Sequence, residues 1–215
     1  MSQDARIVAA RQWWLDSLAA RVETLRAQLW ARQGGETAAR AGAHWEEAQQ
    51  RLTISYWGRM YMVVWPALAV YDAAGQTARP DVAAILLSYL ARADGAPTAG
   101  RWLSFRELPD AGFYHQAFDG YTGQRLASAY GATPERLAQA CRAEGGEPIT
   151  MGDVGFAFLA LPHLWLAVAL WGGDDEMPAQ ARVLFDAAAS HYLDAAGLAG
   201  LGGQLTGRLL RRQSE

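Results

Sequence analysis

The stretch Val154–Gly173 reads VGFAFLALPHLWLAVALWGG and decides what kind of fold this chain has. It contains no charged residue, and its length would be enough for a membrane-spanning helix. Pro162 and His163 interrupt it near the middle, however, and on either side large residues alternate with smaller ones or with Trp165. A period of two is typical of β-strands, and the Pro-His pair is typical of a turn. The stretch therefore predicts a buried β-hairpin rather than a membrane helix.

Other segments predict more antiparallel pairing. Leu52–Trp57 and Met60–Trp65 are rich in β-branched and aromatic residues, and Gly58-Arg59 between them predicts a tight turn. Short strands are expected at Ala67–Tyr71, Trp102–Arg106 and Val183–Phe185. Because hairpins outnumber strand–helix–strand units, the pattern favours an α+β fold with a mostly antiparallel sheet and packed helices.

Helices are predicted from their start and stop signals. Pro80 begins one that runs to Arg92, and Thr133 with Pro134 begins another. A helical stretch is expected over residues 110–130. Asp186 is placed to cap a helix at Ala187–Leu193, and Asp194 to cap the last one.

A long N-terminal amphipathic helix is predicted over residues 4–33, ended by Gly34-Gly35, with a second helix over Glu36–Gln50. The apolar stripe of the first helix packs either on the body of the protein or on another copy, so a homo-oligomer through residues 7–29 is one hypothesis. The stripe consists of Trp14, Leu18, Val22, Leu25 and Leu29. The expected division is an N-terminal helical arm at residues 1–50 and an α+β domain at residues 51–215.

The composition limits the classes of function. A hydrophobic share of 51% and a charged share of 19% indicate an ordered chain. The net charge of −3 gives no basic footprint for nucleic acid. Cys141 is the only cysteine, so this chain forms no internal disulfide and lacks the thiolates of an iron–sulfur cluster. Residues 1–11 lack the apolar core of a signal peptide, and a soluble, cytoplasmic protein without a membrane span is expected.

Several short motifs in the second half of the chain resemble those of a bacterial and archaeal protein family called domain of unknown function 3786. The resemblance covers roughly residues 50–212 and rests on Gly100–Leu108, Gly152-Asp153, Trp171–Pro178, Val183–Asp186, His191–Leu193 and Leu86–Gly95. It implies that the family is frequent in anaerobes and that some members are labelled iron–sulfur proteins. That label depends on cysteine motifs which this chain lacks, so no iron–sulfur site is expected here.

An acidic loop is the candidate metal site. Asp174, Asp175 and Glu176 follow a predicted strand that ends at Trp171. Carboxylates on such a turn can bind a hard cation, and one near a buried tryptophan could act as a general acid. A solvated loop is the simpler interpretation.

Five residues are candidates for binding a ligand: Trp102, Arg106, Trp171, Asp186 and His191. An arginine after an aromatic strand can clamp a carboxylate or phosphate, although an ion pair of Arg106 with Asp110 or Asp153 is the simpler interpretation. His191 is placed to contact Asp186. The nine tryptophans pack in the core or line a pocket for a planar cofactor such as a corrinoid or haem.

Three hypotheses of function remain open. The first is a non-catalytic module that binds a small molecule or a metal cofactor, whose identity the sequence does not give. The second is an interaction module that oligomerises through the N-terminal helix. The third is an enzyme that uses the acidic loop or His191.

Overall fold

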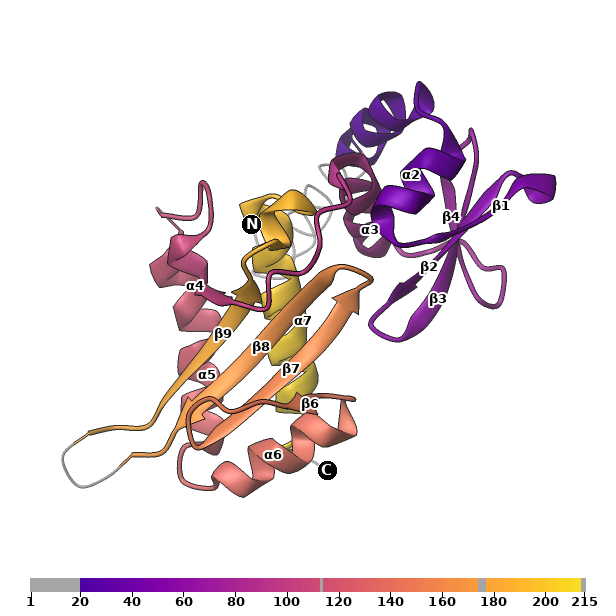
Figure 1. Cartoon of the computed structure of the whole chain (residues 1–215). Helices are drawn as coiled ribbons and strands as arrows, with labels where there is room; N and C mark the ends of the chain where they lie inside the picture. Colours follow the sequence, from indigo (N-terminus) through magenta and orange to yellow (C-terminus); the bar gives the residue numbers. More distant parts are fainter. Residues whose placement is uncertain (1–19, 113, 174–176, 214–215) are drawn as a thin grey trace, which may run out of the picture. The chain divides into compact units, whose positions relative to one another are not determined.

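The predicted hairpin lies at the centre of a five-stranded sheet. The computed structural model describes residues 20–112, 114–173 and 177–213 (Figure 1). Strand β7 (Val154–Leu161) pairs antiparallel with β8 (Leu164–Trp171), with Pro162 and His163 between them. The β-hairpin is therefore confirmed. Among the described residues, no helix is long and apolar enough to cross a membrane.

Three more strands, one long and two short, complete this sheet. Strand β9 (Gln180–Asp186) pairs with β8 from Gln180 to Phe185, and short edge strands flank the centre. The order is β5-β9-β8-β7-β6, and each neighbouring pair is antiparallel. The edge strands are β5 (Trp102–Ser104) and β6 (Glu147–Pro148).

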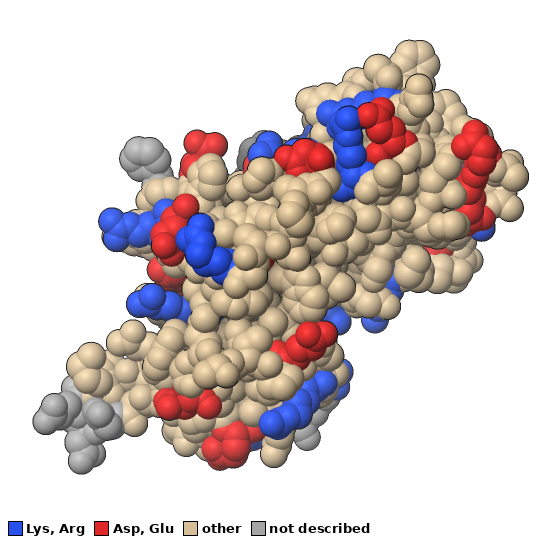
Figure 2. All heavy atoms as spheres, in the orientation of Figure 1, with Lys and Arg blue, Asp and Glu red and all other residues tan. Residues whose placement is uncertain are grey.

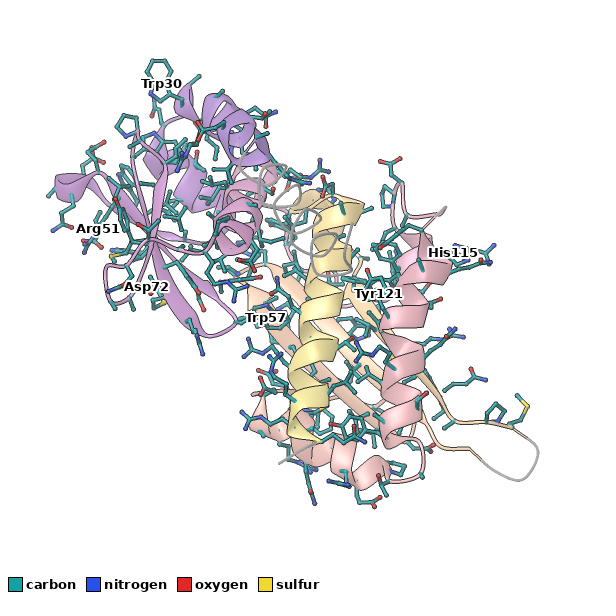
Figure 3. The ribbon with its side chains drawn as sticks, turned by 180° about the vertical axis from the view of Figure 1, so that it is seen from behind. Trp30, Arg51, Trp57, Asp72, His115 and Tyr121 are labelled. Carbon is teal, nitrogen blue, oxygen red and sulfur yellow. The ribbon has the colours of Figure 1, made fainter. Side chains whose placement is uncertain are left out.

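The helices near this sheet gather on one of its faces, behind the strands in Figure 1 and in front of them in Figure 3. The Phe118 ring stacks on Phe105 at 4.2 Å and lies 5.8 Å from Phe185 of β9. Gly202 lies so close to Phe118 that a Cβ there would come within 2.6 Å of the ring. These elements are η2 (Phe105–Glu107), α4 (His115–Tyr121), α5 (Gly123–Tyr130), α6 (Pro134–Ala143), η3 (Ala189–His191) and α7 (Ala195–Arg212).

A separate four-stranded sheet precedes these elements, with the order β1-β2-β3-β4. Its central hairpin turns at Trp57 and Gly58, whose φ angles of 50° and 73° are those of a type I′ turn. This confirms the hairpin predicted from Gly58. The strands are β1 (His44–Glu46), β2 (Arg51–Tyr56), β3 (Arg59–Val64) and β4 (Ala69–Asp72), followed by helix α3 (Pro80–Arg92).

The chain therefore forms two antiparallel sheets where the sequence predicted one. They belong to two compact units, Met1–Gly95 and Ala96–Glu215, and the division falls at residue 95 rather than at the expected residue 50. The physical reason is pairing: β1 lies in the expected arm but forms a ladder with β2. The α+β class and the antiparallel pairing are as predicted.

The N-terminal helix is described only in part. Residues 20–30 are helical, and the rest of the predicted helix, residues 4–19, lies outside the described residues. Val22, Leu25 and Leu29 of the apolar stripe are buried. The helix ends at Trp30, before Gly34 and Gly35, which instead begin α2 (Gly34–Ala41). The Trp45 ring lies so close that a Cβ on Gly34 would come within 2.2 Å of it.

The predicted helix over residues 36–50 is wrong beyond Ala41. Gly42 adopts a left-handed conformation, with φ 63°, and ends α2. Strand β1 and the short 3-10 turn η1 (Glu47–Gln49) follow. Residues 44–46 form a strand because they pair with β2, although helix-favouring residues follow them.

Candidate ligand-binding face

Strand β8 carries two tryptophans on one face of the five-stranded sheet. Successive side chains alternate, so Trp165, Ala167, Ala169 and Trp171 share a face. The register places Ala157 opposite Ala167, Leu159 opposite Trp165, and Arg182 opposite Ala169. Trp102 and Ser104 of β5 lie on the same face, since they pair with Asp186 and Leu184.

We call this surface the tryptophan face. It consists of a floor of small residues and a margin of larger ones, and the helices lie on the opposite face (Figures 1 and 3). Figure 2 shows the middle of this side of the unit largely free of charged side chains, which lie around it. The floor is Gly155, Ala157, Ala167 and Ala169, and the margin is Trp102, Ser104, Leu159, Trp165, Trp171, Arg182 and Leu184.

Most of the margin reaches solvent, whereas Leu184 and the floor are buried. Ala157, Ala167 and Ala169 are buried. Leu159 and Trp171 are 44% and 37% exposed, which is unusual for apolar side chains of this size. The face is thus a shallow apolar surface whose largest side chains remain accessible.

The three tryptophans have a defined spacing. Trp165 and Trp171 are six residues apart on one strand, which corresponds to about 20 Å. Trp102 pairs with Asp186, and the adjacent Phe185 pairs with Leu166, so Trp102 lies two strands away from the Trp165 end of β8. Two strand spacings are about 10 Å. A flat molecule could therefore contact more than one indole ring.

One margin of the face is cationic. The Arg182 guanidinium lies over the Trp171 ring, 5.9 Å from its centroid. Glu107 caps η2 by accepting hydrogen bonds from the hydroxyl and the backbone N–H of Ser104 at 2.7 and 2.8 Å. These bonds, with the charges of Arg101 and Arg182, hold the pKa of Glu107 below its ordinary value. Glu107 is therefore ionised at neutral pH.

Asp186, one of the predicted ligand residues, holds two backbone segments together. Its side chain is 2% exposed, and its carboxylate accepts the N–H groups of Ala99, Gly100 and Ala188 at 2.9, 2.8 and 2.9 Å. The predicted helix over residues 187–193 is only the short η3, so Asp186 caps a turn there. Its main effect is to fix the 96–101 segment against the end of β9.

The 96–101 segment has a second attachment. The Tyr192 hydroxyl donates a hydrogen bond to the Ala96 carbonyl, and the His163 ring stacks on Tyr192 at 5.4 Å. Gly100, at the end of the segment, has a φ of 65°, a conformation that favours glycine. This explains in physical terms why Gly100, Asp186 and Tyr192 occur together in the motifs quoted above.

The five predicted ligand residues do not converge. Trp102 and Asp186 pair at one end of β9, whereas Trp171 pairs with Gln180 at the other end. Arg106 is exposed in η2, and His191 is exposed in η3. The described residues show no ion pair of Arg106 with Asp110 or Asp153, and the Asp153 carboxylate instead accepts the Gly172 N–H at 2.6 Å.

The predicted metal residues cannot be placed. Asp174, Asp175 and Glu176 lie outside the described residues. Elsewhere in the described part of the chain, no three histidine, cysteine or acidic side chains come together as a metal site. Cys141 is buried in α6, and burial raises the pKa of its thiol to about 12.

Sequence reasoning missed two residues of the face, Trp165 and Arg182. A signal for Trp165 was present, because tryptophans six apart on an alternating strand must share a face. Arg182 gave no such signal, since its position over Trp171 depends on the pairing of β8 with β9. Other tryptophans belong to the first unit, where Trp45 and Trp65 pack edge to face with their ring centroids 6.3 Å apart.

These features define an α+β protein of two antiparallel units, with helices on one face of the second sheet and tryptophans on the other. The chain belongs to the family described as domain of unknown function (DUF3786), whose model matches residues 35–208. The match confirms the resemblance and begins earlier than expected, so it includes α2 and β1. Comparisons with curated proteins and with solved structures gave no match.

Proposed function

We propose that this protein is a non-catalytic binding module that holds a small organic molecule with a flat, apolar body on the tryptophan face. One observation carries the proposal: Trp102, Trp165 and Trp171 lie on the face that the helices leave uncovered. We keep the cytoplasmic location predicted from the composition as part of the proposal.

The chemistry of the face suits such a ligand. Indole rings bury large apolar areas and favour stacked or edge-to-face contact with other rings. Because the floor of glycine and alanine is buried, the ligand contacts the accessible side chains of the margin. Because the face is shallow, one side of the ligand would stay exposed to water or be covered by a partner protein. A molecule in a deep pocket is instead enclosed on all sides.

The other two hypotheses have less support. Val22, Leu25 and Leu29, the described part of the stripe proposed for oligomerisation, are buried. The enzyme hypothesis depends mainly on Asp174, Asp175 and Glu176, which lie outside the described residues. The tryptophan face, in contrast, consists of described side chains.

The test is a titration of the full chain with pyrenebutanol, a flat, uncharged probe, followed by energy transfer from tryptophan to pyrene. Because Trp165 and Trp171 lie about 20 Å apart, one pyrene contacts one of them. Trp165→Ala and Trp171→Ala should each weaken binding about tenfold at its own end of the face, which corresponds to the loss of one stacking contact. Trp30→Ala is the matched control, because Trp30 is 68% exposed but lies in the first unit (Figure 3).

Equal affinities in all four proteins would refute the proposal. So would a loss in Trp30→Ala as large as in the two face variants, because pyrene would then bind any exposed indole. A third outcome is that the face variants bind pyrene as the unchanged protein does but lose a complex with another protein. The ligand of the face would then be a protein partner and not a small molecule.

A further inference from the structure

We infer that the ligand of the tryptophan face carries an anionic group, a carboxylate, sulfonate or phosphate, which Arg182 receives beside Trp171. The inference rests on the proposed function and adds the charge of the ligand and its orientation on the sheet.

The position of Arg182 is the first support. It lies opposite Ala169 of the floor, so its side chain rises from the face itself and not from a distant loop. It is exposed, and its guanidinium lies 5.9 Å from the centroid of the Trp171 ring. This distance is within the range of a cation–π contact, which leaves the N–H groups of the guanidinium available for hydrogen bonds. That geometry suits two parallel hydrogen bonds to an anion.

The charges near Arg182 are the second support. Within the described ranges, Arg182 forms no ion pair. The charges of Arg101 and Arg182 help to lower the pKa of Glu107, whose Oε2 accepts hydrogen bonds from the Ser104 hydroxyl and N–H. Among the described residues, the N–H donors of Arg182 are thus not occupied by an ion pair.

The spacing gives the ligand an orientation. With its anionic group at Arg182, the apolar body extends over Ala169 and Ala167 toward Trp165, along β8. The distance from Trp171 to Trp165, about 20 Å, sets the length that such a body can cover. Short aromatic acids should contact Trp171 alone, and longer ones should contact both tryptophans.

The experiment compares three pyrene probes on the full chain: pyrenebutyrate, neutral pyrenebutanol and pyrenebutylammonium. The acid should bind about tenfold more tightly than the alcohol in low salt, and the ammonium probe more weakly than both. The difference should shrink as salt is raised to 0.5 M, because the contact is exposed and therefore screened.

Two variants locate the charge contact. Arg182→Gln should remove the preference for the acid and leave the affinity for the alcohol within about twofold, which also shows that the face is still folded. Arg142→Gln is the matched control. Its guanidinium lies 5.5 Å from the centroid of Phe156, whose side chain points to the helix-covered side of the sheet, so the preference should persist.

The outcomes separate this inference from the proposed function. If the acid and the alcohol bind equally, if the ammonium probe binds best, or if Arg182→Gln keeps the preference, the anionic ligand is wrong while the apolar face stands. If none of the probes depends on Trp165 or Trp171, both fail.

Discussion

At the scale of single residues, Asp186 shows how a polar side chain can resemble a ligand and serve the fold. Its carboxylate is almost fully buried and accepts three backbone N–H groups. A buried carboxylate is stable only when its oxygens are occupied in this way. Aspartate is required here because it is small and has only acceptors.

Asp186→Asn should therefore lower the free energy of unfolding by about 1–3 kcal/mol, because an amide NH2 group faces backbone donors and leaves at least one unsatisfied. Amide hydrogen exchange at Ala99 and Gly100 should become faster. Asp153→Asn is the control, since that exposed carboxylate accepts a single described N–H and should cost less than about 1 kcal/mol. Equal effects of the two substitutions would contradict the role given to Asp186.

Cys141 gives a second prediction at this scale. Burial raises the pKa of the thiol to about 12, so almost no thiolate exists at pH 8. Iodoacetamide should leave the native protein unlabelled at pH 8 and add one group in urea, as read from the mass of the intact chain. Rapid labelling of the native protein would show that α6 is not packed as described.

At the scale of elements, Glu144 ties two helices together. It lies at the end of α6 and accepts hydrogen bonds from Arg208 and Arg212 of α7 at 2.8 and 2.7 Å, with its own side chain only 10% exposed. Partial burial opposes ionisation, but these bonds prevail and hold the pKa of Glu144 below its ordinary value. The contact therefore favours the ionised acid.

Glu144→Gln should destabilise the protein by about 1–2 kcal/mol at pH 7, a value reduced for the partial exposure of the two arginines. The pKa of Glu144 is lower in the folded protein than in the unfolded chain. Its contribution to the free energy of unfolding is therefore fully present above the unfolded pKa and is lost as the pH falls through the folded pKa. Urea unfolding of both proteins at pH 7 and near pH 3 should thus show a difference that narrows in acid. A constant difference would mean that the charge is not involved.

The elements also show what the sequence could predict. The hairpins could be predicted from the strict alternation of residues and from Gly58, and α3 could be predicted from Pro80, because these signals are local. Strand β1 was missed because its pairing with β2 overrides the helical propensity of its neighbours. The number of sheets was not predictable, since it depends on which strands meet across long separations in the chain.

At the scale of the whole molecule, the tryptophan face arises from the order of the strands. Trp165 and Trp171 share a face by alternation alone, which the sequence could show. Trp102 and Arg182 join them only because β9 lies between β5 and β8. The helices cover the opposite face and leave these side chains accessible. The composition shows that tryptophans are frequent, but their positions on the sheet depend on the strand order.

The most direct test of the central claim is an NMR titration of the indole N–H signals of the nine tryptophans with pyrenebutanol. Rings that stack on pyrene experience large ring-current shifts, so each signal reports whether its own side chain contacts the probe. The account predicts large shifts for Trp165 and Trp171, a smaller one for Trp102, and none for Trp30, Trp45 or Trp65. Unshifted signals from Trp165 and Trp171, or larger shifts in the first unit, would contradict it.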